Sequence, residues 1–287
     1  MSNEVNEMSV YDKIRCTRKA GRATAVDYIG GIFTDFTELH GDRRFGDDHA
    51  IVAGIAKLDG KPVTVIGIEK GHDLTERMYR DFGCVLPEGY RKALRLMKEA
   101  EKFHRPVVCF VDTQGASCGK GAEERGEGAA IAENLYEISG LRTPVITVMI
   151  GEGGSGGALA LAVADEVWML ENAYYAVVSP EACASILFKD ASRADEAAEH
   201  LKLTANDLYG FGIVEKIIPE PKDFRDADEV AKLMKHLSRE LSAKLHSLAK
   251  LDDEALLAAR YEKYRKIGRY EEIAAAPTER HRFFRHG

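Results

Sequence analysis

The sequence has few cysteines and lacks the spacing from which disulfide frameworks or zinc sites are built. Among its 287 residues are five cysteines, an odd number, and no two of them are closer than nine residues. The nine histidines show no HxxxH or HExxH spacing. These absences exclude a disulfide-rich secreted domain and a zinc ribbon. We therefore expect no metal in this chain and a reducing, cytoplasmic environment.

An excess of positive charge and a long uninterrupted hydrophobic run are also absent. Forty Lys and Arg stand against 47 Asp and Glu, a net charge of −7, which argues against non-specific binding to nucleic-acid phosphates. The longest mostly apolar stretch, residues 144–164, contains five glycines and Glu152, so it indicates a strand, a turn and a helix rather than a membrane span. The first residues are polar, so no secretory signal is expected. We expect neither nucleic acid nor a membrane as a partner.

Hydrophobic residues make up 45% of the chain, and their spacing predicts an α/β fold. Apolar runs alternate with helical patterns, which is typical of βα units buried on both faces of a sheet. The pair Asp59-Gly60 between two such runs predicts a hairpin. Strands are expected at residues 51–58, 63–68, 107–111, 145–150, 167–170, 175–178 and 213–218. Helices are expected at 27–39, 87–103, 122–139, from about 158, from Pro180 and from 226 to 248, with a mobile loop at 71–86.

The glycine-rich segment GEGGSGG, which begins at Gly151, fits three patterns of different chemistry. It contains the GxGxxG of dinucleotide-binding sites, with Glu171 following twenty residues after the first glycine. It also contains a GxSxG nucleophile elbow around Ser155, which requires a later acid and a histidine such as His200 or His236. The third pattern, small residues between a strand and a helix, needs only the backbone.

The backbone interpretation is based on two turns at the ends of successive predicted strands. Gly115-Ala116 follows one strand, and the segment 153–157 follows the next. Small side chains let the N–H groups at the two helix starts approach one ligand oxygen, which is the arrangement of an oxyanion hole. The same glycines could instead serve only to let helix and strand pack closely. The residues alone leave these interpretations open.

A series of motifs spread over most of the chain resembles one known family. It is similar to the alpha subunit of the bacterial acetyl-CoA carboxylase carboxyltransferase and extends from about Tyr11 to Gly268. The ordered series is far more specific than any single motif in it. Its members are DYIGGIFTDFTELHGDRRFGDD, DGKPVTVIG, PEGYRKALRLMKEAEKF, GKGAEERG, IGEGGSGGALAL, SPEACASIL and RYEKYRKIG.

The resemblance implies a crotonase-type fold, a spiral of ββα units with helical N- and C-terminal extensions. The expected boundaries are 1–45 for the N-terminal extension, 46–222 for the carboxyltransferase core and 223–287 for the C-terminal extension. It also implies that biotin on a separate carrier protein supplies a carboxyl group to acetyl-CoA, giving malonyl-CoA for fatty-acid synthesis. A beta subunit, which in many bacteria carries a zinc ribbon, would complete the active site in an α2β2 heterotetramer.

The same resemblance assigns roles to backbone groups in the two turns. The N–H groups of Gly156, Gly157 and Ala116 are the expected donors to the biotin oxygen on which negative charge develops. No protein base is needed, because in this interpretation biotin itself takes the methyl proton. The expected substrate-binding residues are Gly115, Gly153, Gly154, Lys120 and Arg125.

Two other functions stay open at this point. A stand-alone crotonase-type acyl-CoA hydratase or isomerase would need an acid or base such as Glu123 near the oxyanion hole. A non-catalytic scaffold subunit would keep only the assembly surface. The chain also departs from the family pattern near the expected site, which leaves acyl-CoA preference and rate open. The departures are Gln114, Ser117, Cys118, Ile68, Glu69, His72, Ala182 and, in place of a glutamine, Glu127.

Two apolar stripes at helical spacing, within residues 29–39 and from Val230 to Leu248, exceed the evident needs of a compact core. Such stripes are more typical of packing than of ligand binding. We expect part of them to pack against another subunit, since contiguous exposed apolar surface usually marks an interface.

Overall fold

The backbone of residues 8–268, the part that the computed structural model describes, is organised around an eight-stranded sheet. The strands are β1 (Thr34–Glu38), β2 (Ile51–Leu58), β3 (Lys61–Ile68), β4 (Val107–Thr113), β5 (Val145–Gly154), β6 (Glu166–Leu170), β7 (Tyr174–Ala176) and β8 (Lys216–Ile218). Their order across the sheet is β1-β2-β3-β4-β5-β6-β8, and β7 pairs with the last residues of β5. β4 and β5 are buried along their whole length, so both faces of the sheet centre are covered.

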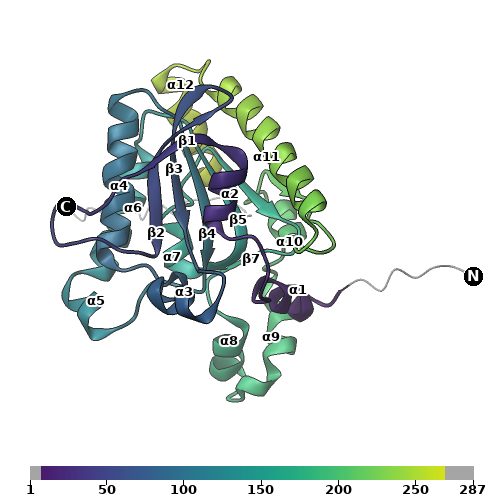
Figure 1. Ribbon diagram of the computed structural model, residues 1–287. Helices are drawn as coiled ribbons and strands as arrows, with labels where there is room; N and C mark the ends of the chain where they lie inside the picture. Colours follow the sequence, from purple (N-terminus) through teal and green to yellow (C-terminus); the bar gives the residue numbers. More distant parts are fainter. Residues whose placement is uncertain (1–7, 269–287) are drawn as a thin grey trace, which may run out of the picture.

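Helices provide this cover (Figure 1). The α-helices are α1 (Val10–Thr17), α2 (Ala25–Ile32), α3 (Leu74–Tyr79), α4 (Pro87–Lys102), α5 (Lys120–Glu124), α6 (Glu127–Ser139), α7 (Ser155–Leu159), α8 (Pro180–Leu187), α9 (Ala194–Leu201), α10 (Ala205–Gly210), α11 (Ala227–Leu248) and α12 (Asp253–Arg265), and two 3-10 helices are η1 (Asp81–Gly83) and η2 (Ala191–Arg193). α2 crosses the sheet with α11 beside it, whereas α4 packs against β2, β3 and α6. α8 and α9 project from the lower end in Figure 1, where α1 contacts α9.

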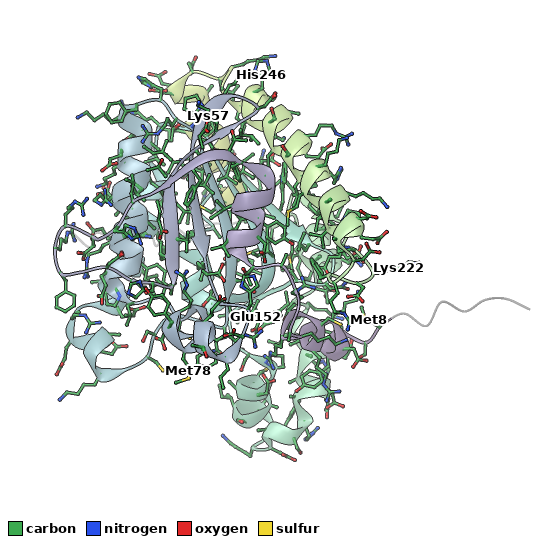
Figure 2. All side chains as sticks on the ribbon, viewed as in Figure 1. Met8, Lys57, Met78, Glu152, Lys222 and His246 are labelled. Atoms are coloured by element: carbon green, nitrogen blue, oxygen red, sulfur yellow. The ribbon has the colours of Figure 1, made fainter. Side chains whose placement is uncertain are left out.

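The hairpin predicted at Asp59-Gly60 is confirmed. β2 and β3 pair antiparallel along their full length, and the two turn residues have φ values of 51° and 74°, as a two-residue hairpin turn requires. From β3 to β8 every neighbouring pair in the sheet is parallel. The carboxyl ends of β3, β4 and β5 therefore lie at one edge, which Glu152 marks in Figure 2, with Lys57 at the opposite edge.

Two sequence predictions in the first third of the chain are wrong. The helix expected over 27–39 ends at Ile32, and the residues that follow form β1, because they pair with the free edge of β2. The segment 71–86, predicted as a loop, contains α3 and η1. α3 forms because the Asp73 side chain caps it, accepting the Glu76 N–H at 2.9 Å.

Two further corrections concern the helices that follow β4 and β5. The single helix expected over 122–139 is two helices, α5 and α6, interrupted at Gly126, whose φ of +83° is left-handed. β5 continues through Gly154, and α7 begins at Ser155 rather than at about 158. The glycine-rich segment is thus a strand end joined directly to a helix, with no separate loop.

The apolar stripe of α11 faces the protein's own core. Leu233, Leu237, Leu241 and Leu245 are buried in the same hydrophobic cluster as the sheet residues, and α11 packs on α2. These four leucines therefore do not contact another subunit, and the expectation that some other part of the stripe does so stays a prediction. Fully burying one leucine side chain stabilises a fold by roughly 1.5–3 kcal/mol, so the stripe anchors the helix to the rest of the chain.

The hydrophobic core includes residues from all three predicted segments, from Ile14 to Leu245, and the boundaries at 45/46 and 222/223 stay predictions. Residues 1–7 and 269–287 of the two expected extensions lie outside the described part. Within 8–268, no helix is both long and apolar enough to cross a membrane. In the same range no cluster of three or more His, Cys, Asp or Glu side chains could hold a metal ion.

Candidate active site

The two turns singled out in the sequence meet where β4 and β5 end. Thr113 of β4 lies in register with Gly153 of β5. A Cβ on Gly154 would collide with the Gln114 carbonyl, and one on Gly157 would lie 2.6 Å from the Ala116 nitrogen. Only glycine allows the two backbones to approach so closely.

The first turn is held by local hydrogen bonds that leave one donor free. The Thr113 hydroxyl accepts the Gly115 N–H at 3.0 Å and donates to the Gly115 carbonyl at 2.8 Å. Gly115 has a φ of +150°, and the Ser117 N–H donates to the Val85 carbonyl at 3.0 Å. Among the described residues the Ala116 N–H between them has no hydrogen-bond partner. It is therefore available to a ligand.

The second turn passes straight from strand to helix. Ser155 has a φ of +39° and is the first residue of α7. Gly156 and Gly157 follow in the first turn of this helix, where N–H groups have no acceptor within the helix itself. Gly157 is buried against the first turn, whereas Gly156 is partly exposed, and a Cβ there would find its nearest neighbour, Ile131, at 3.9 Å.

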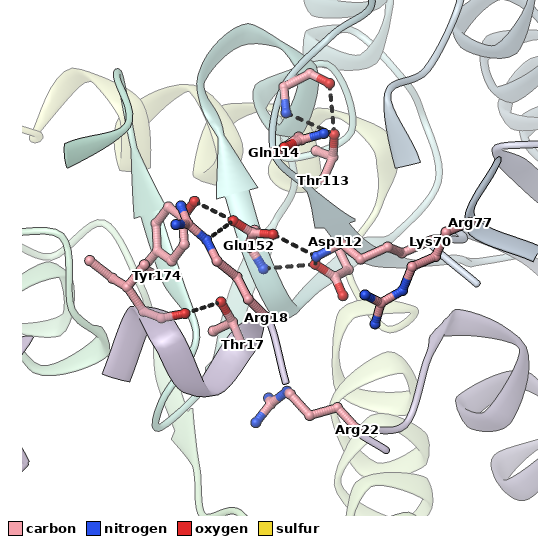
Figure 3. Close-up of polar contacts among 12 residues, drawn as sticks. Thr17, Arg18, Arg22, Lys70, Arg77, Asp112, Thr113, Gln114, Glu152 and Tyr174 are labelled. Atoms are coloured by element: carbon pink, nitrogen blue, oxygen red, sulfur yellow. Dashed lines mark hydrogen bonds and ion pairs between the residues drawn. The ribbon is translucent and has the colours of Figure 1, made fainter. Parts of the chain in front are cut away.

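A cavity of about 600 Å³ opens beside the first turn. Its wall includes Gly115 and Ala116, and its polar floor is a network of charged side chains (Figure 3). Lys70 bridges Asp112 at 2.8 Å and Glu152 at 2.7 Å. Glu152 also accepts hydrogen bonds from Arg18 at 2.9 Å and from the Tyr174 hydroxyl at 2.8 Å.

The charges of this network support one another. Burial alone would raise the pKa of Glu152, but Lys70 and Arg18 lower it below its ordinary value. Burial likewise opposes the charge of Lys70, but Asp112 and Glu152 raise the pKa of its ammonium group. Glu152 and Lys70 are therefore ionised at neutral pH and paired with each other. Arg77, which also lines the cavity, donates to the Gly71 carbonyl at 3.2 Å and pairs with no carboxylate of the described residues.

The geometry does not favour the other two interpretations of the glycine-rich segment. The Ser155 hydroxyl makes no hydrogen bond to any described residue, so no histidine is in place to activate it as a hydrolase would require. His200 is on α9 and His236 is on α11, next to Arg239. The first glycines of the GxGxxG pattern lie inside β5, whereas a dinucleotide fingerprint needs them in the turn that cradles the phosphates.

Comparison with known proteins decides the family. The model of the family described as acetyl co-enzyme A carboxylase carboxyltransferase-like matches residues 1–268. The chain belongs to this carboxyltransferase family. It is 57% identical over 261 residues to the acetyl-coenzyme A carboxylase carboxyl transferase subunit alpha of Ruminiclostridium cellulolyticum, covering 91% of this chain and 98% of that one. It is 56% identical over 267 residues to a beta/alpha protein of Natranaerobius thermophilus, covering 93% of this chain and 44% of that one.

Solved structures confirm the fold of this carboxyltransferase chain. Transcarboxylase 12S superposes with a TM-score of 0.60 at 23% identity, over 82% of this chain and 46% of the other, so the present chain spans about half of it. A Pseudomonas malonate decarboxylase hetero-tetramer in complex with coenzyme A gives 0.60 at 18% identity, over 78% and 88%. The α/β fold of ββα units and the family expected from the sequence motifs are both confirmed.

The structure places the predicted site residues of the carboxyltransferase in three settings. Gly115 and Ala116 line the cavity, Gly157 lies against them, and Gly156 precedes Gly157 without a described contact to the first turn. Gly153 and Gly154 are buried in β5, where they let other backbone segments pass close by. Lys120 and Arg125 lie away from the cavity, the first paired with Glu124 at 3.5 Å and the second with Glu88 at 2.9 Å. The substrate-binding roles expected from the sequence stay predictions.

Sequence reasoning missed the charged floor of the cavity. Lys70, Asp112 and Glu152 were not predicted as site residues, although each lies at or just beyond the carboxyl end of an apolar strand. That position was the available signal, because parallel strands bring their carboxyl ends to one edge. The contributions of Arg18 and Tyr174 come from distant segments and had no sequence signal.

Proposed function

We propose that this chain is the alpha half of an acetyl-CoA carboxylase carboxyltransferase. It moves a carboxyl group from biotin on a carrier protein to acetyl-CoA, giving malonyl-CoA for fatty-acid synthesis. The catalytic role in this proposal is based on one observation, the backbone contact between the turns that follow β4 and β5. The unpartnered Ala116 N–H, together with the N–H groups of Gly157, which lies against it, and of Gly156, the preceding residue of α7, would donate to the oxygen on which negative charge develops.

The cavity is compatible in size and charge with the ring of biotin and its carboxyl group. Its volume of about 600 Å³ is within the roughly 300–1,000 Å³ of small-molecule sites. Bound biotin would supply the carboxyl group. Arg77 would attract that anionic group with its free guanidinium nitrogens, and the Ala116 N–H would hold the ring oxygen. The ion pairs of Lys70 with Asp112 and Glu152 would keep the floor of the cavity rigid beneath the bound ring.

The proposal that a partner subunit binds beside the cavity is based on exposed hydrophobic side chains, which form an apolar rim around it. Large hydrophobic side chains of α3, η1 and α8, and of the residue that follows β7, are exposed on the elements beside the cavity, where Met78 is labelled in Figure 2. They are Leu74, Met78, Tyr79, Phe82, Val177, Ile186 and Leu187. Exposed apolar side chains gathered around a site are typical of an interface. The relative from Natranaerobius thermophilus carries beta and alpha subunits in one chain.

We therefore assign this rim, rather than α11, to a carboxyltransferase beta subunit in an α2β2 assembly. The biotin carboxyl carrier protein would present its biotin at the cavity, and acetyl-CoA would approach from the beta side. The free thiols of all five cysteines are compatible with the cytoplasmic location that we propose.

Reconstitution tests this function. The chain is purified alone and with a carboxyltransferase beta subunit, and carboxyl transfer between malonyl-CoA and biotin is measured. We expect activity from the pair and none from either subunit alone. Hydratase or isomerase activity of the single chain would contradict the proposal; Glu123, the acid such an enzyme would need, is exposed and does not line the cavity. A correct assembly without transfer for any acyl-CoA would indicate a scaffold.

A further inference from the structure

Behind the two turns lies a buried acid that has no hydrogen-bond partner. Glu127, the first residue of α6, is 3% exposed, and in the described part of the chain neither of its carboxyl oxygens makes a hydrogen bond. Tyr90 on α4 faces Glu127 and is completely buried, and its hydroxyl is also without a partner. Nearly all buried polar side chains are hydrogen-bonded, so each exception needs a physical explanation.

These two side chains adjoin the proposed oxyanion hole. The Tyr90 hydroxyl lies 2.9 Å from the position that a Cβ on Gly157 would occupy, and the Ala116 nitrogen lies 2.6 Å from the same position. The Ser117 N–H, next in the turn, faces the Glu127 carboxyl and lowers the pKa of that carboxyl. The hydrogen bond of the Ser117 N–H, however, goes to the Val85 carbonyl. Glu127 itself does not line the cavity. It therefore lies on the side of the turn away from the cavity, next to Ser117.

The charged groups around Glu127 are mostly acidic. Its surroundings contribute Asp48 from the loop before β2, Glu88 and Tyr90 from α4, Glu123 from α5, and Arg125 after α5. Arg125, the cation of this set, donates to both carboxyl oxygens of Glu88, at 2.9 and 3.1 Å. Burial first, and then Asp48, Glu123 and Glu88, raise the pKa of Glu127 to about 8. The helix dipole of α6 favours the ionised form but does not offset these effects.

We propose that Glu127 is a positioning residue that carries a proton in the active enzyme, and that its ionisation switches off the oxyanion hole in front of it. This inference rests on the proposed role of the Ala116 and Gly157 turns. The physical reason is electrostatic. An ionised, unpartnered carboxylate behind the Ala116 N–H would repel the negative charge that the same N–H must stabilise. The neutral acid carries no such charge, so it does not weaken the attraction between the N–H groups of the turn and the developing anion.

A pH profile with an isosteric variant tests the switch. Glu127→Gln replaces the neutral acid by a neutral amide, and Glu124→Gln, on the exposed side of α5, is the matched control. With the beta subunit present, kcat for carboxyl transfer is measured from pH 6 to 9.5. The wild-type kcat should fall at least about tenfold as Glu127 ionises, and Glu124→Gln should follow it. Glu127→Gln should keep the neutral-pH kcat within about threefold and lose this decline. An unchanged decline in Glu127→Gln would overturn the proposal.

A direct titration separates this inference from the function on which it rests. Carboxyl-¹³C glutamate resonances of the wild-type complex are followed with pH, and the Glu127 signal is assigned by its absence in Glu127→Gln, or in Glu127→Ala should the first variant fail to fold. We expect Glu127 to be protonated at pH 7 and to titrate near pH 8. An ionised Glu127 at pH 7 would refute the inference even if the turns are catalytic. Conversely, a protonated Glu127 with a harmless Gly157→Ala change would refute the role of the turns.

Discussion

A single methyl group added at Gly157 should reduce carboxyl transfer far more than the same group added at Gly156. In Gly157→Ala the new Cβ would lie 2.6 Å from the Ala116 nitrogen, 2.9 Å from the Gly115 carbonyl carbon and 2.9 Å from the Tyr90 hydroxyl. Ordinary contacts begin at 3.4 Å, so the first turn must move by about 0.8 Å. In Gly156→Ala the Cβ has its nearest neighbour, Ile131, at 3.9 Å, and nothing has to move.

The size of the effect follows from this displacement. Losing one oxyanion donor costs about 3 kcal/mol of barrier, or 10²- to 10³-fold in kcat, and a misplacement near 1 Å costs about 10²-fold. We expect Gly157→Ala to lower kcat by about 10²-fold. The crowding should also cost about 1–3 kcal/mol of unfolding free energy, which lowers Tm by several degrees in a chain of this size. Gly156→Ala should change kcat by less than threefold.

The assay is carboxyl transfer between malonyl-CoA and biotin by the complex with the beta subunit, at a temperature well below the Tm of each variant. Thermal unfolding of the same samples distinguishes a lost donor from a lost fold. Full activity of a folded Gly157→Ala complex would refute the reasoning. An equal loss in Gly156→Ala would also refute it, because crowding of the first turn would no longer distinguish the two positions.

Other predictions concern the cavity floor and the core. Lys70→Met should cost about 3–5 kcal/mol of unfolding free energy, since it leaves Asp112 buried without its cation and Glu152 with Arg18 alone; an unchanged Tm would contradict this. In the wild type, Lys70 and Arg18 hold the pKa of Glu152 below its ordinary 4.5 despite burial. The stability that the ionised Glu152 contributes should therefore be present above pH 4.5 and be lost as the pH falls further. Chemical denaturation at a series of pH values measures this loss. Arg77→Gln should raise KM for the biotin substrate at least fivefold without lowering Tm, because the guanidinium nitrogens that face the cavity are free; an unchanged KM would exclude it as a ligand. Leu241→Ala should cost about 2–5 kcal/mol yet leave binding of the beta subunit unchanged in sedimentation.

Local signals made part of the fold predictable from the sequence. The Asp59-Gly60 hairpin depends on two adjacent residues that tolerate positive φ. The start of α8 depends on Ser179, whose hydroxyl accepts the Ala182 N–H at 3.2 Å. The helix predicted over 27–39 joined apolar residues that belong to α2 and to β1. Periodicity alone does not show that the edge of β2 is free to pair with the second of these segments.

The candidate site likewise combines features that the sequence predicts with features that it does not. The close backbone approach at Gly157 could be predicted, because small residues at the ends of two successive strands allow it. The Lys70–Glu152 pair could not, because it depends on the register of three strands. The stripe of α11 likewise shows an apolar face but not what covers it, and Leu237 proved to face the chain's own core.

Replacing a single backbone amide tests the central claim most directly. Lactic acid incorporated in place of Ala116 exchanges its N–H for an oxygen and leaves the side chain unchanged. The same exchange at the exposed Ala132 of α6 is the control, where one helix hydrogen bond is lost far from chemistry. We predict that the complex carrying the ester at Ala116 keeps its Tm within a few degrees and loses 10²- to 10³-fold in kcat, while the control keeps its kcat. A folded complex that turns over at the wild-type rate without the Ala116 N–H would contradict the account.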